Sequence, residues 1–375
     1  MQIAVNTICL GDETASKNQL FLQQVVNVLM TKYPEHHFFL IVRNTDKQCF
    51  NSSANSTPVL VRSAITSLAA LKIWNNVQLP RILKKLKADV VLQPYGLFSA
   101  VTRIPQVIVI ENLLWINQPR FLTTMQAWRA KYHTKQAIKK ANQVIVLSAS
   151  AKQDLIAQFP KVAHKISFVS AAANPIFQPI DSIQRQQTKD SYADGREYFL
   201  FAGGNQPVKN IEGMLKAFSL FKKWHKSNMK LLVAGAFSFS PKNDVLAKLN
   251  SYKYKEDVVL LKDITIQQLA TVTAAAYAFI CPAFYEADAV PLLSAIQCGV
   301  PVIAAANANL KEAGGEACLY APANDIEALA NQMKLLYKDE QQRSALIAKG
   351  LQEVAVFNWE KTADTAWDCL EKAVG

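Results

Sequence analysis

Short apolar runs alternate with longer amphipathic segments along the whole chain. The runs are continuously apolar rather than alternating, so they predict strands that are covered on both faces and joined by crossover helices. This pattern indicates an α/β protein built from doubly wound parallel sheets. The predicted strands lie at 2–7, 37–43, 89–94, 106–111, 143–148 and 165–170, and then at 198–203, 230–235, 258–263, 277–282, 301–305 and 317–321.

Segments of helical period separate these runs. The clearest helices of the first half are expected at 18–33 and 125–140. The later ones are expected at 210–225, 241–250, 265–276, 290–299, 325–339 and in the tail 357–375.

The length of 375 residues suits two domains rather than one core. The stretch 174–198 is rich in Pro, Asp, Ser and Gln without a sustained apolar period, and it predicts a linker. We expect an N-terminal domain at 1–180, a C-terminal domain at 181–356 and a helix at 357–375 that could pack back on the N-terminal domain. Ligands are expected at the carboxyl ends of the strands, in the cleft between the domains.

The charge balance narrows the choice of partners. Lys and Arg number 41 against 29 Asp and Glu, which gives +12 and a pI near 9.3. This balance favours an acidic membrane surface or a phosphate-bearing ligand. The sequence has no zinc pattern, RNA-binding aromatic motif or dense Arg stripe, so no nucleic-acid partner is expected. A solvated helix face is the alternative explanation for clusters such as Lys84–Lys87.

Cysteine usage and hydropathy bear on location and cofactors. The six cysteines, at 9, 49, 281, 298, 318 and 369, form no CxxC pair and have no His at metal spacing. We therefore expect no metal or other cofactor, and a reducing cytoplasm. The opening residues lack the features of a signal peptide, and no apolar run reaches the length of a membrane span. Any membrane contact is expected to be peripheral.

The segment "FAGGNQPVKN", Phe201–Asn210, combines a strand end, a tight turn and a helix start. Gly203 and Gly204 allow the backbone to approach a ligand, and the free amides of a helix start attract phosphate. Lys209 would add a full positive charge beside it. The same succession also occurs in folds that bind no ligand there.

The segment "AFYEADAVPLLSAIQCGVPVI" has the same topology one crossover later. Glu286 lies in the turn, and Pro291 suits a helix start because its missing amide is no loss there. The carboxylate could receive sugar hydroxyls while the amides of Ala289 and Val290 meet an anion. The alternative is an ordinary acid that complements the helix dipole.

These motifs carry a resemblance to a known family. "KNIEGMLKAF", "EADAVPLLSAIQCGVPVI", "LKEAGGEACLY" and "FNWEKTA" occur in the order of the retaining, nucleotide-sugar-dependent glycosyltransferases of group 1, also called family 4. "MQIAVNT" and "ANQVIVLSASAKQDLI" follow the same order, so the resemblance covers nearly the whole chain. It implies the GT-B fold, with two Rossmann-like domains that face each other across a cleft. The first would hold the acceptor and the second the nucleotide-sugar donor.

The resemblance also implies roles for individual residues. Lys209 matches the lysine that contacts the donor diphosphate, and Glu286 matches the first glutamate of the paired-acid motif, which holds hydroxyls of the donor sugar. Glu111 and Asn112 stand where the family has a His-Asp pair near the acceptor. The residues expected to bind the donor are Gly203, Gly204, Asn205, Gln206, Asn210, Asp288, Ala289, Val290, Pro291 and Ser294.

Several positions depart from the family pattern. Ser294 replaces the second glutamate, which would receive the nucleotide ribose, and it can form no charged bidentate bond. Asp288 stands inside the segment that is Gly-Phe-Gly in the family, where an inward carboxylate would repel a diphosphate. Gly11 is the only glycine left in the N-terminal loop. Such changes around one cleft suggest either an altered donor and acceptor or a lost reaction.

Two hypotheses follow. The first is a glycosyltransferase that moves a sugar from a nucleotide-sugar donor to a saccharide or lipid-linked acceptor with retention, in cell-envelope polysaccharide or lipopolysaccharide synthesis. It would work in the cytoplasm, held at the inner face of an anionic membrane. The alternative is a catalytically degenerate homologue that binds a glycan, a nucleotide or a partner protein.

Overall fold

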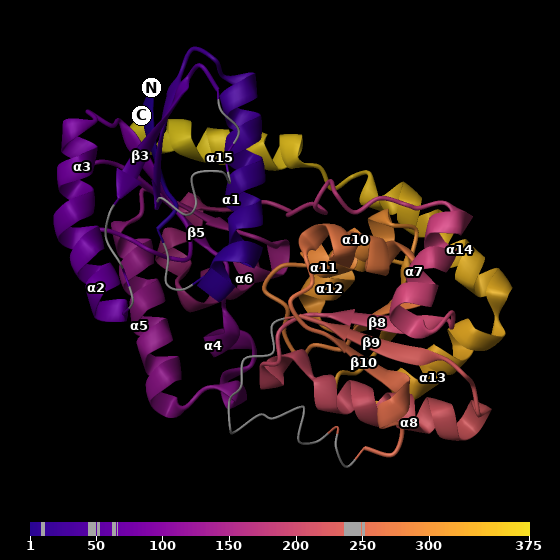
Figure 1. The fold of residues 1–375 in the computed structure, drawn as a ribbon. Helices are drawn as coiled ribbons and strands as arrows, with labels where there is room; N and C mark the ends of the chain where they lie inside the picture. Colours follow the sequence, from indigo (N-terminus) through magenta and orange to yellow (C-terminus); the bar gives the residue numbers. More distant parts are fainter. Residues whose placement is uncertain are drawn as a thin grey trace. The chain divides into compact units, whose positions relative to one another are not determined.

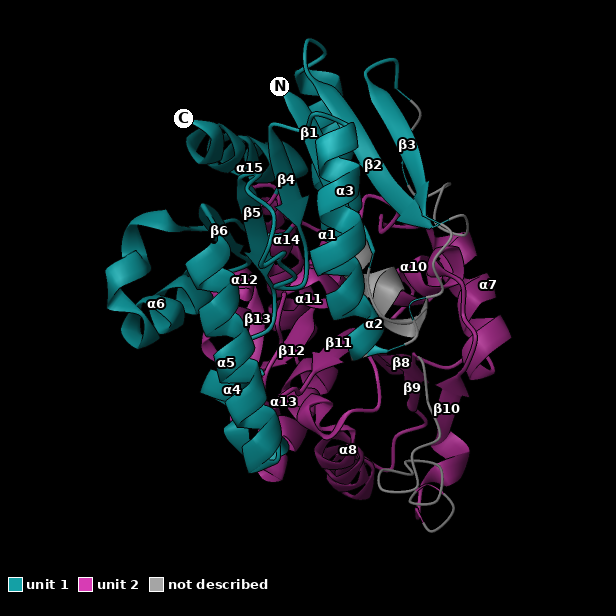
Figure 2. Ribbon diagram, turned by 90° about the vertical axis from the view of Figure 1, so that its left-hand side faces the viewer, with its two compact units in different colours: residues 1–171, 358–375 teal, residues 172–357 magenta. Residues whose placement is uncertain are grey.

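The computed structural model describes residues 1–8, 12–43, 50, 53–61, 65, 67–235, 249 and 252–375. It divides into two compact units (Figure 2). The first comprises residues 1–171 together with 358–375, and the second comprises residues 172–357. The division therefore falls before the predicted linker rather than at residue 180, and the C-terminal helix belongs to the first unit.

The first unit contains a sheet of seven parallel strands in the order β3-β2-β1-β4-β5-β6-β7. Six of them were predicted. The seventh, β3, was missed because it is an edge strand that carries Pro58 and has no buried position, and its apolar run covers only residues 59–61. The strands are β1 (Gln2–Asn6), β2 (His37–Arg43), β3 (Ser56–Val61), β4 (Val90–Gln93), β5 (Gln106–Ile110), β6 (Gln143–Val146) and β7 (Ile166–Phe168).

Helices accompany this sheet (Figure 1). Each strand and the next are joined through crossovers, as parallel pairing requires. The helices are α1 (Asp12–Lys32), α2 (Leu68–Ile73), α3 (Leu79–Lys85), α4 (Leu114–Asn117), α5 (Thr124–Lys140), α6 (Ala149–Gln158) and α15 (Trp359–Val374), and a π-helical turn at Trp74–Gln78 joins α2 to α3. In the described part of the chain no helix is long and apolar enough to cross a membrane.

The C-terminal helix α15 completes the first unit by packing along α1 (Figure 1). The ring of Trp367 stacks on Tyr33 with centroids 3.7 Å apart and an interplanar angle of 10°. Thr362 Oγ1 donates to the backbone oxygen of Ser170 at 2.6 Å. The apolar face that the sequence predicts for this helix is therefore buried against residues from the other end of the chain.

The second unit contains a sheet of six parallel strands in the order β10-β9-β8-β11-β12-β13, all of them predicted. The strands are β8 (Tyr198–Ala202), β9 (Lys230–Ala234), β10 (Val258–Leu261), β11 (Ala278–Cys281), β12 (Val302–Ala305) and β13 (Cys318–Ala321). The helices are α7 (Ser182–Ala193), α8 (Ile211–His225), α10 (Ile266–Ala274), α11 (Val290–Gln297), α12 (Ala308–Gly314), α13 (Ile326–Lys338) and α14 (Glu340–Val354). The helix expected at 241–250 lies outside the described residues except for Leu249.

The expected linker contains a helix, so that prediction was wrong. Helix α7 begins after Asp181, whose side chain accepts a hydrogen bond from Gln184 N, and it ends at Asp194 in the left-handed conformation. Few of its side chains are buried, which is why the segment shows no apolar period. It belongs to the second unit and packs beside α10.

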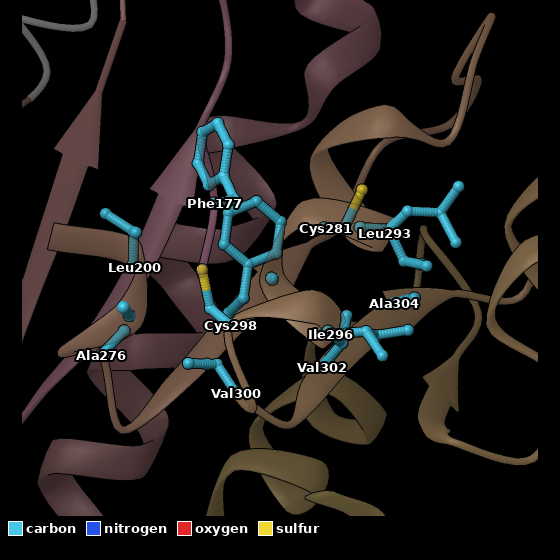
Figure 3. Packing of buried hydrophobic residues seen from close by; sticks show 14 of the residues in the cluster. Phe177, Leu200, Ala276, Cys281, Leu293, Ile296, Cys298, Val300, Val302 and Ala304 are labelled. Carbon is cyan, nitrogen blue, oxygen red and sulfur yellow. The ribbon is translucent and has the colours of Figure 1, made fainter. Parts of the chain in front are cut away.

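Apolar side chains fill both faces of the second sheet. Figure 3 shows one of these clusters, in which Leu200 of β8 and Val302 of β12 lie among side chains of α11 such as Leu293 and Ile296. Cys298 belongs to the same cluster, and burial raises the pKa of its thiol to about 12. It therefore stays protonated and acts as a small apolar side chain.

Candidate active site

The second sheet has a topological switch point between β8 and β11. These two strands are neighbours, yet the chain runs from β8 outward to β9 and from β11 outward to β12. Crossovers therefore leave this point in opposite directions, and the crevice at the carboxyl ends of the two strands is where such sheets bind ligands. Both predicted motifs begin there, since 203–210 follows β8 and 282–289 follows β11.

Backbone and amide hydrogen bonds join the two motifs. Phe284 N donates to Val208 O at 2.8 Å, and Asn210 Nδ2 donates to Pro282 O at 3.1 Å. The same amide also donates to Ala323 O at 2.6 Å. Asn210 is buried and has a φ of +59°, and its side chain leaves no room for a Cβ at Gly213. The Asn210 amide thus holds the loops together, and its assignment to the donor stays a prediction.

The turn after β8 packs tightly against the end of β9. Gly203 N donates to Ala234 O at 2.9 Å. Gly235 follows with a φ of +146°, and a Cβ there would stand 1.9 Å from Gly203 O. The backbone therefore requires glycine at this contact. Gly204, Asn205 and Gln206 continue the turn with part of their surface exposed.

Lys209 and Glu286 form an ion pair at the centre of the site. Lys209 Nζ donates to Glu286 Oε1, and the two side chains are 20% and 10% exposed. Burial lowers the pKa of Lys209, but the charge of Glu286 and the hydrogen bond to it outweigh this effect and hold the pKa above its usual value. Asp288 acts in the same direction. Lys209 is therefore a partly buried ammonium at neutral pH, neutralised mainly by one carboxylate.

Two asparagines of the next crossover position the loop that carries Glu286. Asn309 Nδ2 donates to Glu286 O at 2.7 Å, and Asn307 Nδ2 donates to Ala283 O at 3.1 Å. Asn307 also caps α12 by accepting from Leu310 N. Neither residue was predicted from the sequence. Their place after β12, beside the strand that precedes Glu286, was the available signal.

The start of α11 differs from what the sequence suggested. Val290 N, which was expected to face an anion, donates to Asp288 Oδ1 at 3.1 Å. Pro291 has no amide, and Ala289 supplies no side-chain cap. An anion could reach the Val290 amide only by displacing the Asp288 carboxylate. In this structure the Asp288 carboxylate therefore occupies the Val290 amide at the start of α11.

Ser294 lies one turn further along α11. Ser294 is 2% exposed, and its Oγ has no hydrogen-bond partner among the described residues. A buried unpaired hydroxyl is costly, so a polar partner would be favoured there. The contact between Ser294 and the ribose stays a prediction. It requires that the start of α11 move enough to expose the Ser294 hydroxyl.

The candidate acceptor residues lie in the first unit, directly after β5. Asn112 Oδ1 accepts from Leu114 N at 2.8 Å, which starts α4, and Glu111 is partly buried. Gly11 lies outside the described residues. Within the described ranges, no group of three or more His, Cys, Asp or Glu side chains could hold a metal ion.

The second unit is similar to a known family. Residues 182–353 match the family described as glycosyl transferases group 1. The matched residues make up a little under half of the chain. The match covers α7 through most of α14 and includes the Lys209–Glu286 pair. The resemblance that the sequence motifs suggested is thereby confirmed.

Curated relatives include enzymes of O-antigen synthesis. The chain is 27% identical over 237 residues to the O-antigen chain mannosyltransferase B of Escherichia coli, covering 62% of each chain. It is 26% identical over 256 residues to the serotype-specific mannosyltransferase WbdA of Escherichia coli, covering 67% of this chain and 31% of that one. The chain thus matches about three fifths of the first relative's length and a third of the second's.

Solved structures share the fold over nearly the full length. A sucrose-phosphate synthase from Thermosynechococcus elongatus superposes with a TM-score of 0.80 at 19% identity, covering 99% of both chains. WaaG, a glycosyltransferase involved in lipopolysaccharide biosynthesis, gives 0.74 at 14% identity, covering 98% of this chain and 99% of that one. The predicted GT-B class, with two Rossmann-like parallel-sheet units, is confirmed.

Proposed function

We propose that this chain transfers a sugar from a nucleotide-sugar donor to a saccharide or lipid-linked acceptor with retention at the anomeric carbon. Mannose is the sugar we favour. The Lys209–Glu286 pair carries the proposal. It joins a cation and a carboxylate at the switch point of the family domain, where a doubly wound sheet binds its ligand.

The chemistry of the pair suits a donor with an anionic leaving group. As the glycosidic bond breaks, negative charge develops on the departing diphosphate, and the Lys209 ammonium would stabilise it. Glu286 would accept hydrogen bonds from hydroxyls of the donor sugar and so orient it. Without donor each residue neutralises the other. Donor binding would exchange that contact for two new ones, so neither charge would be left buried and unpaired.

The relatives favour a mannosyl donor and a role in cell-envelope polysaccharide synthesis. Several of them are named mannosyltransferases, two of them O-antigen chain mannosyltransferases and another a serotype-specific mannosyltransferase. Among the structures of similar fold, Anabaena HepE was solved with UDP and glucose, and covers 99% of both chains at a TM-score of 0.73. These names support a nucleotide-linked hexose as donor.

A second candidate is a homologue that binds a glycan, nucleotide or protein without turnover. Two observations favour it. Asp288 occupies the Val290 amide, and the enclosed Ser294 replaces the acid that the family directs at the ribose. Retention of Lys209 and Glu286, in contact with each other at the switch point, favours the enzyme.

Binding and turnover with a panel of donors test the choice. We expect saturable calorimetric binding of one of the GDP-, UDP- or ADP-linked sugars, with GDP-mannose foremost, and competition by its free nucleotide. Donor consumption with an oligosaccharide acceptor would establish transfer. The one-bond coupling between the anomeric carbon and its proton in the NMR spectrum of the product would establish retention. Binding without consumption would support the second candidate. No binding of any donor would contradict the proposed function.

Replacing Asn309 with Ala should lower turnover by about tenfold while leaving donor affinity within a few-fold. The hydrogen bond from Asn309 Nδ2 to the backbone oxygen of Glu286 fixes the loop that carries the Glu286 carboxylate. Small displacements of a positioned group reduce rates strongly. Loss of one neutral hydrogen bond should also reduce the free energy of unfolding by about 1 kcal/mol. Steady-state kinetics and urea unfolding measure the two effects.

Tyr277→Phe is the matched control for Asn309→Ala. It removes one bond to a backbone oxygen, that of Tyr277 Oη to Leu336 O at 2.8 Å, at the opposite end of β11. We expect a similar loss of stability with unchanged turnover. If both variants lost turnover equally, Asn309 would have no special role in placing Glu286.

A further inference from the structure

The excess positive charge belongs almost entirely to the first unit. This unit carries 22 Lys and Arg against 11 Asp and Glu, whereas the second unit carries 19 against 18. The first unit thus holds +11 of the net +12. A donor diphosphate bound at the switch point of the second unit does not account for this charge, which favours a separate anionic partner for the first unit.

The asymmetry is sharpest around α5. Between Glu111 and Asp154 the sequence contains no acidic residue. The same stretch contains seven basic ones, at Arg120, Arg129, Lys131, Lys135, Lys139, Lys140 and Lys152. Five of the seven lie on α5. No local carboxylate is therefore available in this stretch to neutralise them.

Helix α5 also exposes large apolar side chains. Met125, Trp128 and Tyr132 are 55%, 60% and 53% exposed. Their spacing of three and four residues places them along one line of the helix, opposite the face that buries Thr134, Ala137 and Ile138. The Trp128 and Tyr132 rings stack with centroids 5.7 Å apart and an interplanar angle of 15°. The outer face of α5 is therefore aromatic where a solvated helix would be polar.

The charges of α5 frame this aromatic line. Lys135 and Lys139 continue it at the next spacings of three and four residues, while Arg129 and Lys131 stand on either side, all of them exposed. We call Met125, Trp128, Tyr132, Arg129, Lys131, Lys135 and Lys139 the α5 face. It spans roughly 20 Å along the helix, given a rise of about 1.5 Å per residue.

A neighbouring loop extends the apolar surface. Val101 is exposed, and the residue before it, Ala100, accepts a hydrogen bond from Lys140 Nζ at 2.6 Å. Phe98 of the same loop contacts His133 of α5, with ring centroids 5.3 Å apart. The hydrogen bond and the ring contact thus hold α5 against this loop.

We propose that the α5 face docks on a bilayer surface rich in anionic phospholipid. Indole and phenol rings settle at the level of the headgroups, where one side is apolar and the other wet. Lysines on the same line reach headgroup phosphates, and each such residue strengthens attachment electrostatically. A basic helix with aromatic and apolar side chains on its exposed face lies in the plane of such an interface. Docking is independent of the proposed transfer reaction, because it needs neither donor nor acceptor.

Vesicle flotation of the full chain tests the proposal. The probes are vesicles of phosphatidylcholine alone and vesicles with roughly one third phosphatidylglycerol. We expect binding to the anionic vesicles only, weakened by salt. Trp128→Ser with Tyr132→Ser should weaken binding at least about tenfold, because the buried aromatic area is lost. Lys135→Glu with Lys139→Glu should weaken it at least about thirtyfold.

Matched variants in the second unit serve as controls. Trp224→Ser removes another exposed tryptophan, and Lys223→Glu with Lys338→Glu makes the same change of net charge. Both should bind vesicles as the unaltered chain does, and circular dichroism should show all variants folded. Equal loss in the control and α5 variants would overturn the proposal, as would no vesicle binding at low salt. Binding of RNA instead of vesicles, abolished by the α5 variants, would reassign the face to nucleic acid.

Discussion

Glu286→Gln should reduce donor-dependent turnover by at least about a hundredfold. The substitution keeps the shape of the side chain but removes the charge that holds Lys209, and it replaces one of the two oxygens offered to the sugar hydroxyls with an NH2 donor. Loss of one well-placed electrostatic group at a reacting centre costs about this much or more. Steady-state kinetics with the donor found in the binding panel measure the change.

The same substitution should also affect stability. It leaves the Lys209 ammonium buried without its carboxylate, and breaking such a pair costs about 3 kcal/mol or somewhat less where water reaches the site. Glu316→Gln is the matched control, because Glu316 pairs with Lys349 on the surface. We expect this control to change neither turnover nor the melting temperature. Full turnover by Glu286→Gln would contradict the proposed role of the pair.

A double variant separates structure from chemistry at this pair. Lys209→Met combined with Glu286→Leu removes both charges and fills the space with apolar atoms. Replacing a whole buried pair in this way is often neutral or stabilising. We therefore expect stability to recover while turnover stays lost. If turnover recovered together with stability, the pair would serve only to hold the two loops.

Trp367→Ala should destabilise the first unit by about 3 to 5 kcal/mol. Trp367 is buried on α15 and stacks on Tyr33, so its removal leaves a large cavity between the C-terminal helix and α1. Because α15 belongs to the first unit, that unit should unfold at a lower urea concentration than the second. Circular dichroism should then show two transitions.

The control for Trp367→Ala is Trp224→Ala. Trp224 lies on α8 of the second unit and is 38% exposed, so its removal leaves no enclosed cavity. We expect a change below about 1 kcal/mol. If Trp367→Ala also changed stability by less than this, α15 would be an appendage and no part of the core of the first unit.

The sheets could be predicted well because their signal is local. Buried parallel strands such as β5 and β11 are short runs in which all residues, or all but the first, are apolar, and this property is visible in the sequence. Elements whose apolar runs are short or lacking were missed. Strand β3 is a half-exposed edge strand, and α7 is a polar helix that begins at a single capping residue, Asp181.

The candidate site could be placed for a similar reason. Turns that follow apolar strands and open helices fall at the carboxyl edge of a parallel sheet, so Lys209 and Glu286 could be named as candidate site residues. Their mutual contact was not, because they are 77 residues apart in sequence. The same holds for Asn309, which reaches Glu286 O from the crossover after β12.

By itself, then, the sequence determined the class of fold, the number of domains and the two loops that meet at the site, because apolar period and turn chemistry act over a few neighbouring residues. Only the tertiary structure decided that Lys209 is neutralised by Glu286, that Asp288 occupies the Val290 amide and that α15 completes the first unit. Partners of a buried charge, an amide or an aromatic ring are chosen by packing in space. The order of residues along the chain does not specify these partners, because many other residues of the same type could have filled the role.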